Sequence, residues 1–113
     1  MKEYLFIYRN DLSALPNVTK EEAQAATKKW MDWMGSIAAQ NKLSNRGNRL
    51  TNSGRVLRAN NKVTDGPYSE IKESIGGFSI VKVDSYEEAV ELAKGCPVFS
   101  FGGNVEIREV DQL

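Results

Sequence analysis

A motif in the middle of the chain carries the residue types best suited to chemistry. It reads TDGPYSEIKESIGGFSI and runs from Thr64 to Ile80. An Asp side chain usually accepts a hydrogen bond from the backbone N–H two residues further on, but here that residue is Pro67, which has none. The Asp65 carboxylate is therefore available to the N–H of Tyr68 or Ser69, or to a partner outside the loop. The motif is either a simple turn or a loop that contacts a ligand.

Three charged side chains of this motif could form a polar site. Asp65 would act as a hydrogen-bond acceptor or general base, and Lys72 would bind an anion, with Glu70 beside them. The alternative is a surface salt bridge between Lys72 and one of the acids, worth about 0–1 kcal/mol. The pair Gly76-Gly77 suggests a positive φ, or the close approach of a backbone or a ligand. The ligand-binding version of the site consists of Asp65, Gly66, Pro67, Tyr68, Lys72 and Gly77, together with Arg58.

A second candidate is a group of arginines upstream of this motif. Arg46, Arg49, Arg55 and Arg58 fall within thirteen residues that contain no acid. They could bind a carboxylate or phosphate, or they could belong to a solvated hairpin. Because no aromatic residues alternate with them, they are weak evidence for nucleic-acid binding.

The remaining candidates are apolar or aromatic. Trp30, Trp33 and Met34 share one helix face and form either part of the core or the wall of an apolar pocket. Tyr8, on the first strand, could reach that pocket with its hydroxyl, or be a core tyrosine. Cys96 follows the end of a helix and has no His to lower its pKa, which favours a packed side chain over a nucleophile.

The composition excludes several classes of chemistry. The sequence has no His, which removes imidazole acid–base catalysis, a Ser–His or Cys–His nucleophile and most zinc or copper sites. We therefore expect no metal and no cofactor. Fifteen Lys and Arg balance fifteen Asp and Glu, and this net charge of zero disfavours a general nucleic-acid binder.

The sequence also bears on location and domain number. The N-terminal apolar run Tyr4–Tyr8 is too short for a signal-peptide core, and no stretch approaches the roughly 20 apolar residues of a membrane span. A single Cys allows no internal disulfide, which fits a reducing compartment. We expect a cytoplasmic protein with one domain over residues 1–113.

Hydrophobic periodicity and capping motifs predict the elements that position these residues. The segment 43–54 reads as a loop with a short irregular strand near Leu50, and Ser69–Ser74 as one or two helical turns. The other expected elements are a strand Lys2–Arg9, a loop Asp11–Asn17, a helix from the capping box Thr19–Glu22 to near Asn41, a hairpin of Arg55–Ala59 and Lys62–Thr64 around Asn60-Asn61, a strand Gly77–Val83, a helix from the capping box Ser85–Glu88 to a left-handed Gly95, and a strand Asn104–Val110. This βαββαβ order predicts an α+β, ferredoxin-like sandwich with a hairpin insertion.

The pattern of apolar residues predicts which faces are covered. In the first helix the buried face should hold Ala23, Ala26, Trp30, Trp33, Met34 and Ile37. In the strands we expect Phe78, Ile80 and either Val81 or Val83 inward, and Val105, Ile107 and Glu109 on one face. Phe6, Tyr8, Phe78, Ile80 and Ile107 cannot all face the helices, so a second copy of the sheet should cover the other face in a homodimer.

Several segments of the sequence resemble one known family. The matching residues are Tyr4-Leu5-Phe6-Ile7-Tyr8, Val63-Thr64-Asp65-Gly66-Pro67-Tyr68 with Glu70 and Lys72, Gly76-Gly77-Phe78, and Cys96-Pro97 with Gly102-Gly103-Asn104-Val105-Glu106-Ile107-Arg108. They resemble the DGPF-domain branch of the YCII-related family over nearly the whole chain, with Tyr68 where the family name has Phe. The resemblance implies a dimeric α+β barrel of ferredoxin-like subunits.

The resemblance also bears on activity and partners. The wider family includes enzymes similar to muconolactone-isomerase-type and dehydrochlorinase proteins, and some members are thought to use a His–Asp pair whose Asp precedes a Pro after the second helix. This chain has no His and has Cys96 before Pro97, so that pair cannot be carried over. Members of the DGPF branch are often encoded beside, or fused to, extracytoplasmic-function sigma factors, which implies a regulatory link.

Three functions stay open at this point. The first is a small-molecule-binding or regulatory homodimer without His-based catalysis, whose ligand is acidic or aromatic. The second is a lyase or isomerase of the dimeric-barrel type that uses Asp65 or Tyr8 in proton transfer. The third is a partner of a sigma factor. The missing His favours binding over catalysis.

Overall fold

The structure, a computed structural model, describes residues 1–10, 19–66 and 74–112. Its elements in chain order are β1 (Lys2–Asn10), α1 (Lys20–Ala39), β2 (Leu43–Asn45), β3 (Arg55–Leu57), β4 (Val63–Asp65), β5 (Ser74–Val83), α2 (Tyr86–Ala93), the 3₁₀ helix η3 (Pro97–Phe101) and β6 (Asn104–Glu109).

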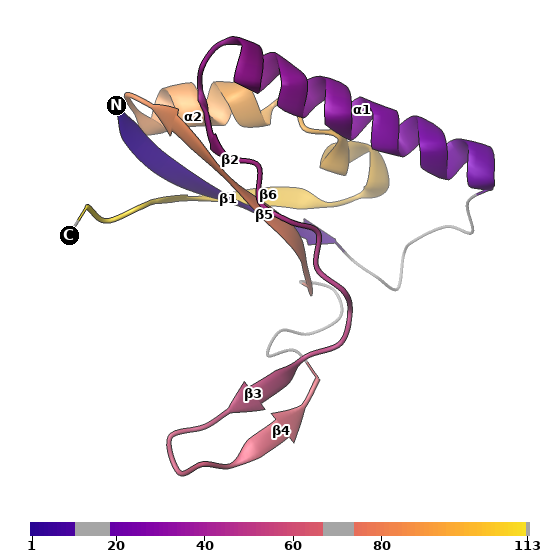
Figure 1. Ribbon diagram of the computed structural model, residues 1–113, viewed down its shortest axis with the longest axis vertical. Coiled ribbons are helices and arrows are strands. Elements are labelled where there is room, and N and C mark those ends of the chain that lie inside the picture. The colour runs from indigo at the N-terminus through magenta and orange to yellow at the C-terminus, as the bar shows by residue number, and fades with distance from the viewer. Residues whose placement is uncertain (11–18, 67–73, 113) are drawn as a thin grey trace.

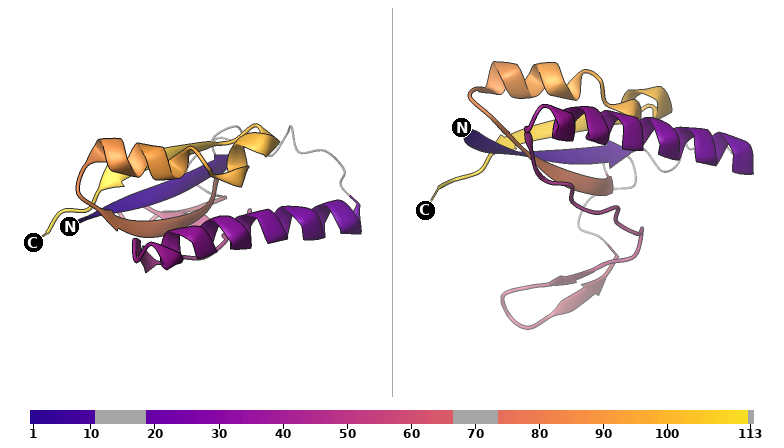
Figure 2. Two further views of the ribbon diagram at one scale, coloured as in Figure 1. Left: turned by 90° about the horizontal axis from the view of Figure 1, so that it is seen from above. Right: turned by 45° about the horizontal axis from the view of Figure 1, so that its top comes forward.

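A four-stranded antiparallel sheet forms the centre of the fold, with its strands in the order β2-β5-β1-β6. Figure 1 shows α1 and α2 covering one face of this sheet, and the views in Figure 2 agree. Strands β3 and β4 pair with each other as a separate hairpin, inserted between β2 and β5. The chain order, the sheet and the inserted hairpin confirm the predicted α+β, ferredoxin-like fold.

Strand β1 lies in the middle of the sheet and is apolar on both faces, as its sequence predicts. Tyr4, Phe6 and Tyr8 are buried in the core between the sheet and the helices. Leu5 and Ile7 alternate with them and so point to the opposite face of the sheet. We call this second face, which lies away from the helices, the open face.

The predicted orientation of β5 is partly wrong. The register pairs Phe78 with Ile7 and Ile80 with Leu5, so Phe78 and Ile80 lie on the open face and not inward. The residues buried in the core are Ser79, Val81 and Val83. Both alternating sets in this strand contain apolar residues, so the sequence alone does not fix which set faces the helices.

Helix α1 begins as predicted but is covered over less of its length. The Thr19 hydroxyl accepts the Glu22 N–H at 3.1 Å, which confirms Thr19 as the N-cap of the predicted capping box. Trp33 and Ile37 are buried, whereas Ala23, predicted on the same face, is exposed. Figure 2 shows why: the N-terminal half of α1 extends past the end of β1.

Helix α2 and strand β6 complete the fold near their predicted positions. The Ser85 hydroxyl accepts the Glu88 N–H at 3.2 Å, as a second capping box should. Gly95 does not have the predicted positive φ. In β6, Ile107 is paired with Phe6 in β1, which places it on the helix-covered face together with Val105 and Glu109.

The segment 43–54 contains more regular structure than its polar sequence predicts. Leu43 pairs with Val81, which makes β2 the edge strand next to β5. Further along, the Leu50 N–H donates to the Gly76 carbonyl oxygen at 2.9 Å, and Arg49 forms an isolated bridge with Gly77. A three-residue edge strand with exposed Ser and Asn carries little periodicity, so the sequence analysis missed β2.

Two predicted segments lie outside the described residues. They are the loop Asp11–Asn17 and the helical turns from Ser69 onward, of which only Ser74 is described, as the first residue of β5. Within the described ranges, no helix has the length and apolar character needed to cross a membrane.

Candidate functional site

The candidate site is centred on the hydroxyl of Tyr8, beneath α1. Tyr8 is only 6% exposed, and its ring packs edge-to-face against Trp30 at 4.9 Å and against Trp33 at 6.0 Å between centroids. The two indoles are themselves 5.8 Å apart at 77°. We call these three residues the aromatic cluster. Their geometry is the one that aromatic quadrupoles favour, and it places a phenol in an apolar environment.

The Tyr8 hydroxyl has no hydrogen-bond partner in the part of the chain that the structure describes. Ser79, on the neighbouring strand, is near enough to affect the pKa of Tyr8, but its own hydroxyl donates to the Arg46 carbonyl oxygen at 2.7 Å. The Met34 sulfur lies 3.9 Å from the same Ser79 oxygen. The Tyr8 hydroxyl is therefore an unused hydrogen-bond donor, whereas the neighbouring Ser79 hydroxyl and Trp33 indole N–H both have partners.

Burial determines the protonation state of this site. It raises the pKa of the Tyr8 phenol well above its ordinary value, the Cys96 thiol adds to the rise, and Ser79 opposes it. Burial likewise raises the pKa of Cys96 to about 11, so its thiol is neutral at physiological pH. The neutral Tyr8 phenol can therefore donate a hydrogen bond, whereas loss of its proton is disfavoured. The structure confirms the expectation that Cys96 is a packed side chain, since it is buried in the core.

The position of Trp33 is fixed from two sides. Its indole N–H donates to the Leu92 carbonyl oxygen of α2 at 3.1 Å. A Cβ at Gly95 would lie 3.2 Å from the Trp33 ring, so this glycine allows the chain after α2 to pass close to the indole. Trp30, by contrast, is only partly buried, which makes it the more accessible of the two indoles.

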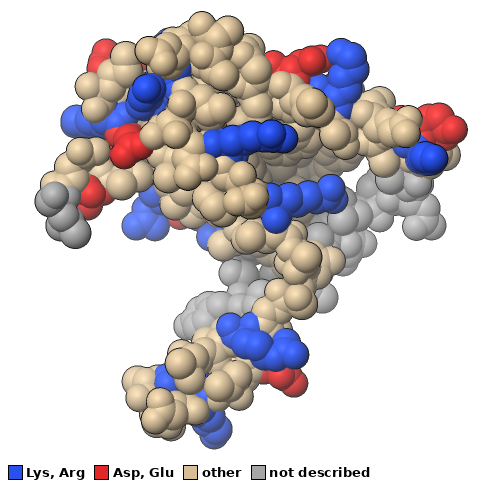
Figure 3. Space-filling view, viewed as in Figure 1, with Lys and Arg blue, Asp and Glu red and all other residues tan. Residues whose placement is uncertain are grey.

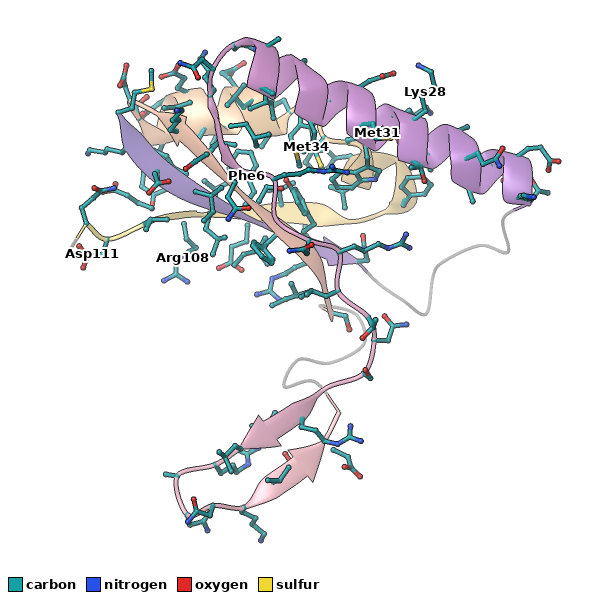
Figure 4. The ribbon with its side chains drawn as sticks, viewed as in Figure 1. Phe6, Lys28, Met31, Met34, Arg108 and Asp111 are labelled. Atoms are coloured by element: carbon teal, nitrogen blue, oxygen red, sulfur yellow. The ribbon has the colours of Figure 1, made fainter. Side chains whose placement is uncertain are left out.

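The surface below α1 is hollowed. Figure 3 shows a recess there with basic side chains at its border. In Figure 4, Met34 lies beneath α1, between the helix and the sheet, as its contact with Ser79 requires. A separate shallow depression of about 470 Å³ runs along the outer flank of α1, but it is lined by residues of that one helix, from Lys20 to Asp32.

The structure does not bring Asp65 and Tyr8 together, because Asp65 lies in the hairpin that projects from the sheet. Asp65 ends β4 in the projecting hairpin, where its carboxylate is 96% exposed and pairs with Arg55 Nε at 3.3 Å. Gly66 has φ 80° and donates its N–H to the Gly54 carbonyl oxygen at 2.8 Å, so it closes the base of the hairpin. Arg58 is exposed near the hairpin tip. The roles predicted for these residues in ligand binding stay predictions.

Four other predicted residues, Pro67, Tyr68, Glu70 and Lys72, lie outside the described residues. Gly77 is described, and the close approach expected there is by backbone. A Cβ at Gly77 would lie 2.9 Å from the Asn48 carbonyl oxygen, and the neighbouring Phe78 N–H donates to that same oxygen. This packing accounts for the glycine without a ligand.

The four arginines do not share one element. The backbone carbonyl of Arg46 contacts β5, and Arg49 bridges Gly77, whereas Arg55 and Arg58 belong to the hairpin. A single anion patch that uses all four stays a prediction. Among the described residues, no group of three or more Cys, Asp and Glu side chains is arranged to hold a metal ion.

The sequence predicts Tyr8 and both indoles as candidates but gives no such indication for Ser79. The available signal was one small polar residue in the apolar run GFSIVKV, at a position that alternates with buried valines. Its partner, the Arg46 carbonyl, comes from a segment without predicted regular structure, so the pairing could not be anticipated.

Comparisons with known proteins place the chain in a family. No curated protein matches it. Among solved structures, it is similar to 5-chloro-2-hydroxyhydroquinone dehydrochlorinase (TftG) from Burkholderia phenoliruptrix AC1100, in complex with 2,5-dihydroxybenzoquinone, with 16% identity and a TM-score of 0.49 over 97% of this chain and 95% of that one. The model of the YCII-related domain matches residues 1–113, and the chain therefore belongs to the YCII-related family.

Proposed function

We propose that this protein is a small-molecule-binding homodimer whose ligand is an aromatic ring with a carboxylate or carbonyl group. The observation that carries the proposal is the buried, neutral Tyr8 hydroxyl without a partner in the described chain. An unsatisfied buried polar group costs about 1–3 kcal/mol. A ligand oxygen that accepts a hydrogen bond from the Tyr8 hydroxyl would recover that free energy, and this gain would favour ligand binding at the site.

The surroundings of Tyr8 favour the proposed class of ligand. Trp30 and Trp33 offer aromatic edges and faces against which a planar ring can pack. The basic side chains at the border of the recess in Figure 3 favour an acidic group on that ring. A purely aliphatic ligand would use neither feature.

The homodimer is supported by the open face. Leu5, Ile7, Phe78 and Ile80 are adjacent in the register, so they form an apolar centre on that face. Charged residues surround it: Glu106 accepts from Arg9 and also pairs with Arg108, and Figure 4 shows Arg108 pointing away from the helices. An apolar centre with a charged rim is the usual composition of a protein interface.

The alternative of a lyase or isomerase is limited by the same geometry. Tyr8 is poorly suited to proton transfer, because burial raises the pKa of its phenol far above the working pH. The other candidate, Asp65, is fully solvated on the hairpin of its own subunit. Binding without turnover is therefore the simpler proposal, and a sigma-factor partner stays a prediction from the family resemblance.

Tryptophan fluorescence tests the proposed site directly, since Trp30 and Trp33 are the only tryptophans. Titration with benzoate, 4-hydroxybenzoate and acetophenone should change the emission in a saturable way for at least one probe. Tyr8→Phe should weaken the affinity for that probe about five- to tenfold, which corresponds to the loss of one hydrogen bond of roughly 1 kcal/mol.

A matched control removes a hydroxyl elsewhere. Tyr86→Phe deletes a phenol oxygen that accepts the Glu109 N–H at 2.9 Å, on α2, and should leave the affinity unchanged. Equal affinity in Tyr8→Phe and the unmodified protein would remove Tyr8 from the site. No saturable response to any of the three probes would contradict the proposed ligand class.

A further inference from the structure

We infer that the hairpin β3–β4 is an arm that grips the second subunit of the homodimer. The arm is defined here as residues 54–66, from the Gly54 carbonyl to the Gly66 N–H that closes its base. The inference rests on the proposed dimer but goes beyond it, because it assigns a partner surface to a segment with no place in the subunit core.

Among the described residues, the arm forms a sheet of its own, separate from the four-stranded sheet of the core. Each of its strands has three residues, and they pair only with each other among the described strands. Figure 1 shows it projecting away from the sheet and both helices. A two-stranded hairpin alone is marginally stable in water. A contact outside its own subunit is the simplest source of the missing stabilisation.

One face of the arm carries an exposed apolar pair. Leu57 and Val63 are opposite each other in the register and are 68% and 58% exposed. Leu50, on the connection that leads into the arm, is 44% exposed. Cross-strand apolar neighbours on a projecting element are typical anchors for a partner surface.

The arm lies on the side where the second subunit is expected. In Figure 1 the helices cover one side of the sheet and the arm projects on the other, and the right-hand view of Figure 2 shows the same arrangement. A second copy docked on the open face would therefore come within reach of the arm. Two-fold symmetry would give each subunit one arm around its partner.

Charge favours contact between an arm and the body of another copy. The arm, residues 54–66, contains three basic residues and one acid, a net charge of +2. The rest of the chain contains twelve basic and fourteen acidic residues, a net charge of −2. Opposite signs attract an arm to a neighbouring body and oppose contact between two arms.

Sedimentation of the full-length protein over a concentration series tests the inference. Leu57→Ser/Val63→Ser should raise the dimer dissociation constant at least about tenfold, because two apolar anchors are lost. Val90→Ser removes a comparably exposed side chain from α2, 42% exposed, and should leave the constant unchanged. Circular dichroism should show both variants folded, since neither site belongs to the core.

The outcomes separate this inference from the proposed function. If the arm variant dimerises with unchanged affinity, the inferred contact between the arm and the second subunit is overturned, whereas the proposed homodimer is not affected. A monomeric unmodified protein would overturn both, whereas the fluorescence titration would still decide the ligand site. If the protein is a monomer and retards a DNA duplex in an electrophoretic mobility-shift assay, the basic arm binds nucleic acid. That result would overturn the inference that the arm binds a second copy of the chain.

A direct measurement covers the case in which the arm variant is uninformative. A photo-crosslinking amino acid at position 57 should yield an adduct of twice the subunit mass, with the linked peptide in the body of the other copy. Crosslinks found only within one subunit would overturn the inference.

Discussion

At the scale of single residues, the buried Tyr8 hydroxyl costs folding free energy because it lacks a partner in the described chain, and the same hydroxyl is able to bind a ligand. The Tyr8 ring contributes to the core through the two indoles, while its hydroxyl is desolvated without a partner in the described chain. A phenylalanine would keep the ring packing and remove the unsatisfied oxygen. The Tyr8 hydroxyl therefore adds no hydrogen bond to the stability of the described chain, which supports the proposed role in binding.

This reasoning gives a stability prediction for the protein without ligand. Tyr8→Phe should leave the free energy of unfolding unchanged or raise it by up to about 1 kcal/mol, because no hydrogen bond is lost. Tyr86→Phe should lower it by about 0.5–1 kcal/mol, since the Glu109 N–H loses its acceptor. Urea unfolding measures both. A Tyr8→Phe variant that is the less stable of the two would mean that the Tyr8 hydroxyl does have a partner.

The sequence predicts the members of the aromatic cluster but not the state of the hydroxyl. Alternation in β1 and the three- and four-residue spacing in α1 are enough to bring Tyr8 near Trp30 and Trp33. Whether the hydroxyl has a partner depends on Ser79, whose proton is committed to the Arg46 carbonyl. A contact between three distant segments leaves no periodic signal.

At the scale of elements, the N-terminus of α2 is joined to the sheet edge by Glu88. Its carboxylate accepts the Asp84 N–H at 3.0 Å and pairs with Lys42 at 3.1 Å. The backbone hydrogen bond, followed by Lys42, lowers the pKa of Glu88 below its ordinary value. This carboxylate therefore stabilises the folded state when it is ionised.

The consequence is a defined dependence of stability on pH. Because the pKa of Glu88 is lower in the folded chain, its contribution is complete above the ordinary value of 4.5 and is lost as the pH falls through the folded value. Glu88→Gln should lower stability at neutral pH and flatten the fall below pH 4.5. Unfolding at a series of pH values checks this against Glu91→Gln, which breaks an exposed pair with Lys94. Identical profiles for the two variants would exclude the role of Glu88.

A pair of glycines tests how the hairpin is attached to the sheet. Gly77→Ala should destabilise the fold by about 1–3 kcal/mol, because its Cβ would lie 2.9 Å from the Asn48 carbonyl oxygen. Gly35→Ala, in α1 with nothing within 4 Å of the new Cβ, should instead stabilise by up to about 1 kcal/mol. Thermal or urea unfolding distinguishes them. A neutral Gly77→Ala would show that the segment around Asn48 adjusts freely.

The elements were predictable where local signals are strong. Both capping boxes and the hairpin turn at Asn61, where φ is 64°, are set by neighbouring residues. The inward face of β5 and the edge strand β2 were not, because each depends on which distant strand it pairs with.

At the scale of the whole molecule, both described α-helices cover the same face of the sheet. The core lies between the sheet and the helices, with Phe6 and Val81 completely buried. The open face and the arm are two apolar surfaces outside this core. The alternation of β1 predicts such a second surface from the sequence, but the projection of the arm follows only from the structure.

Strand β1 serves both surfaces at once. Tyr8 points to the helices, whereas its immediate neighbours Ile7 and Arg9 point to the open face. Because adjacent residues of β1 belong to opposite faces, a shift of the backbone at Tyr8 would also move Ile7 and Arg9 on the open face. If binding of a small molecule changes the dimerisation constant by some factor, dimerisation must change the affinity for that molecule by the same factor. Titrations at low and high protein concentration would then give different apparent affinities.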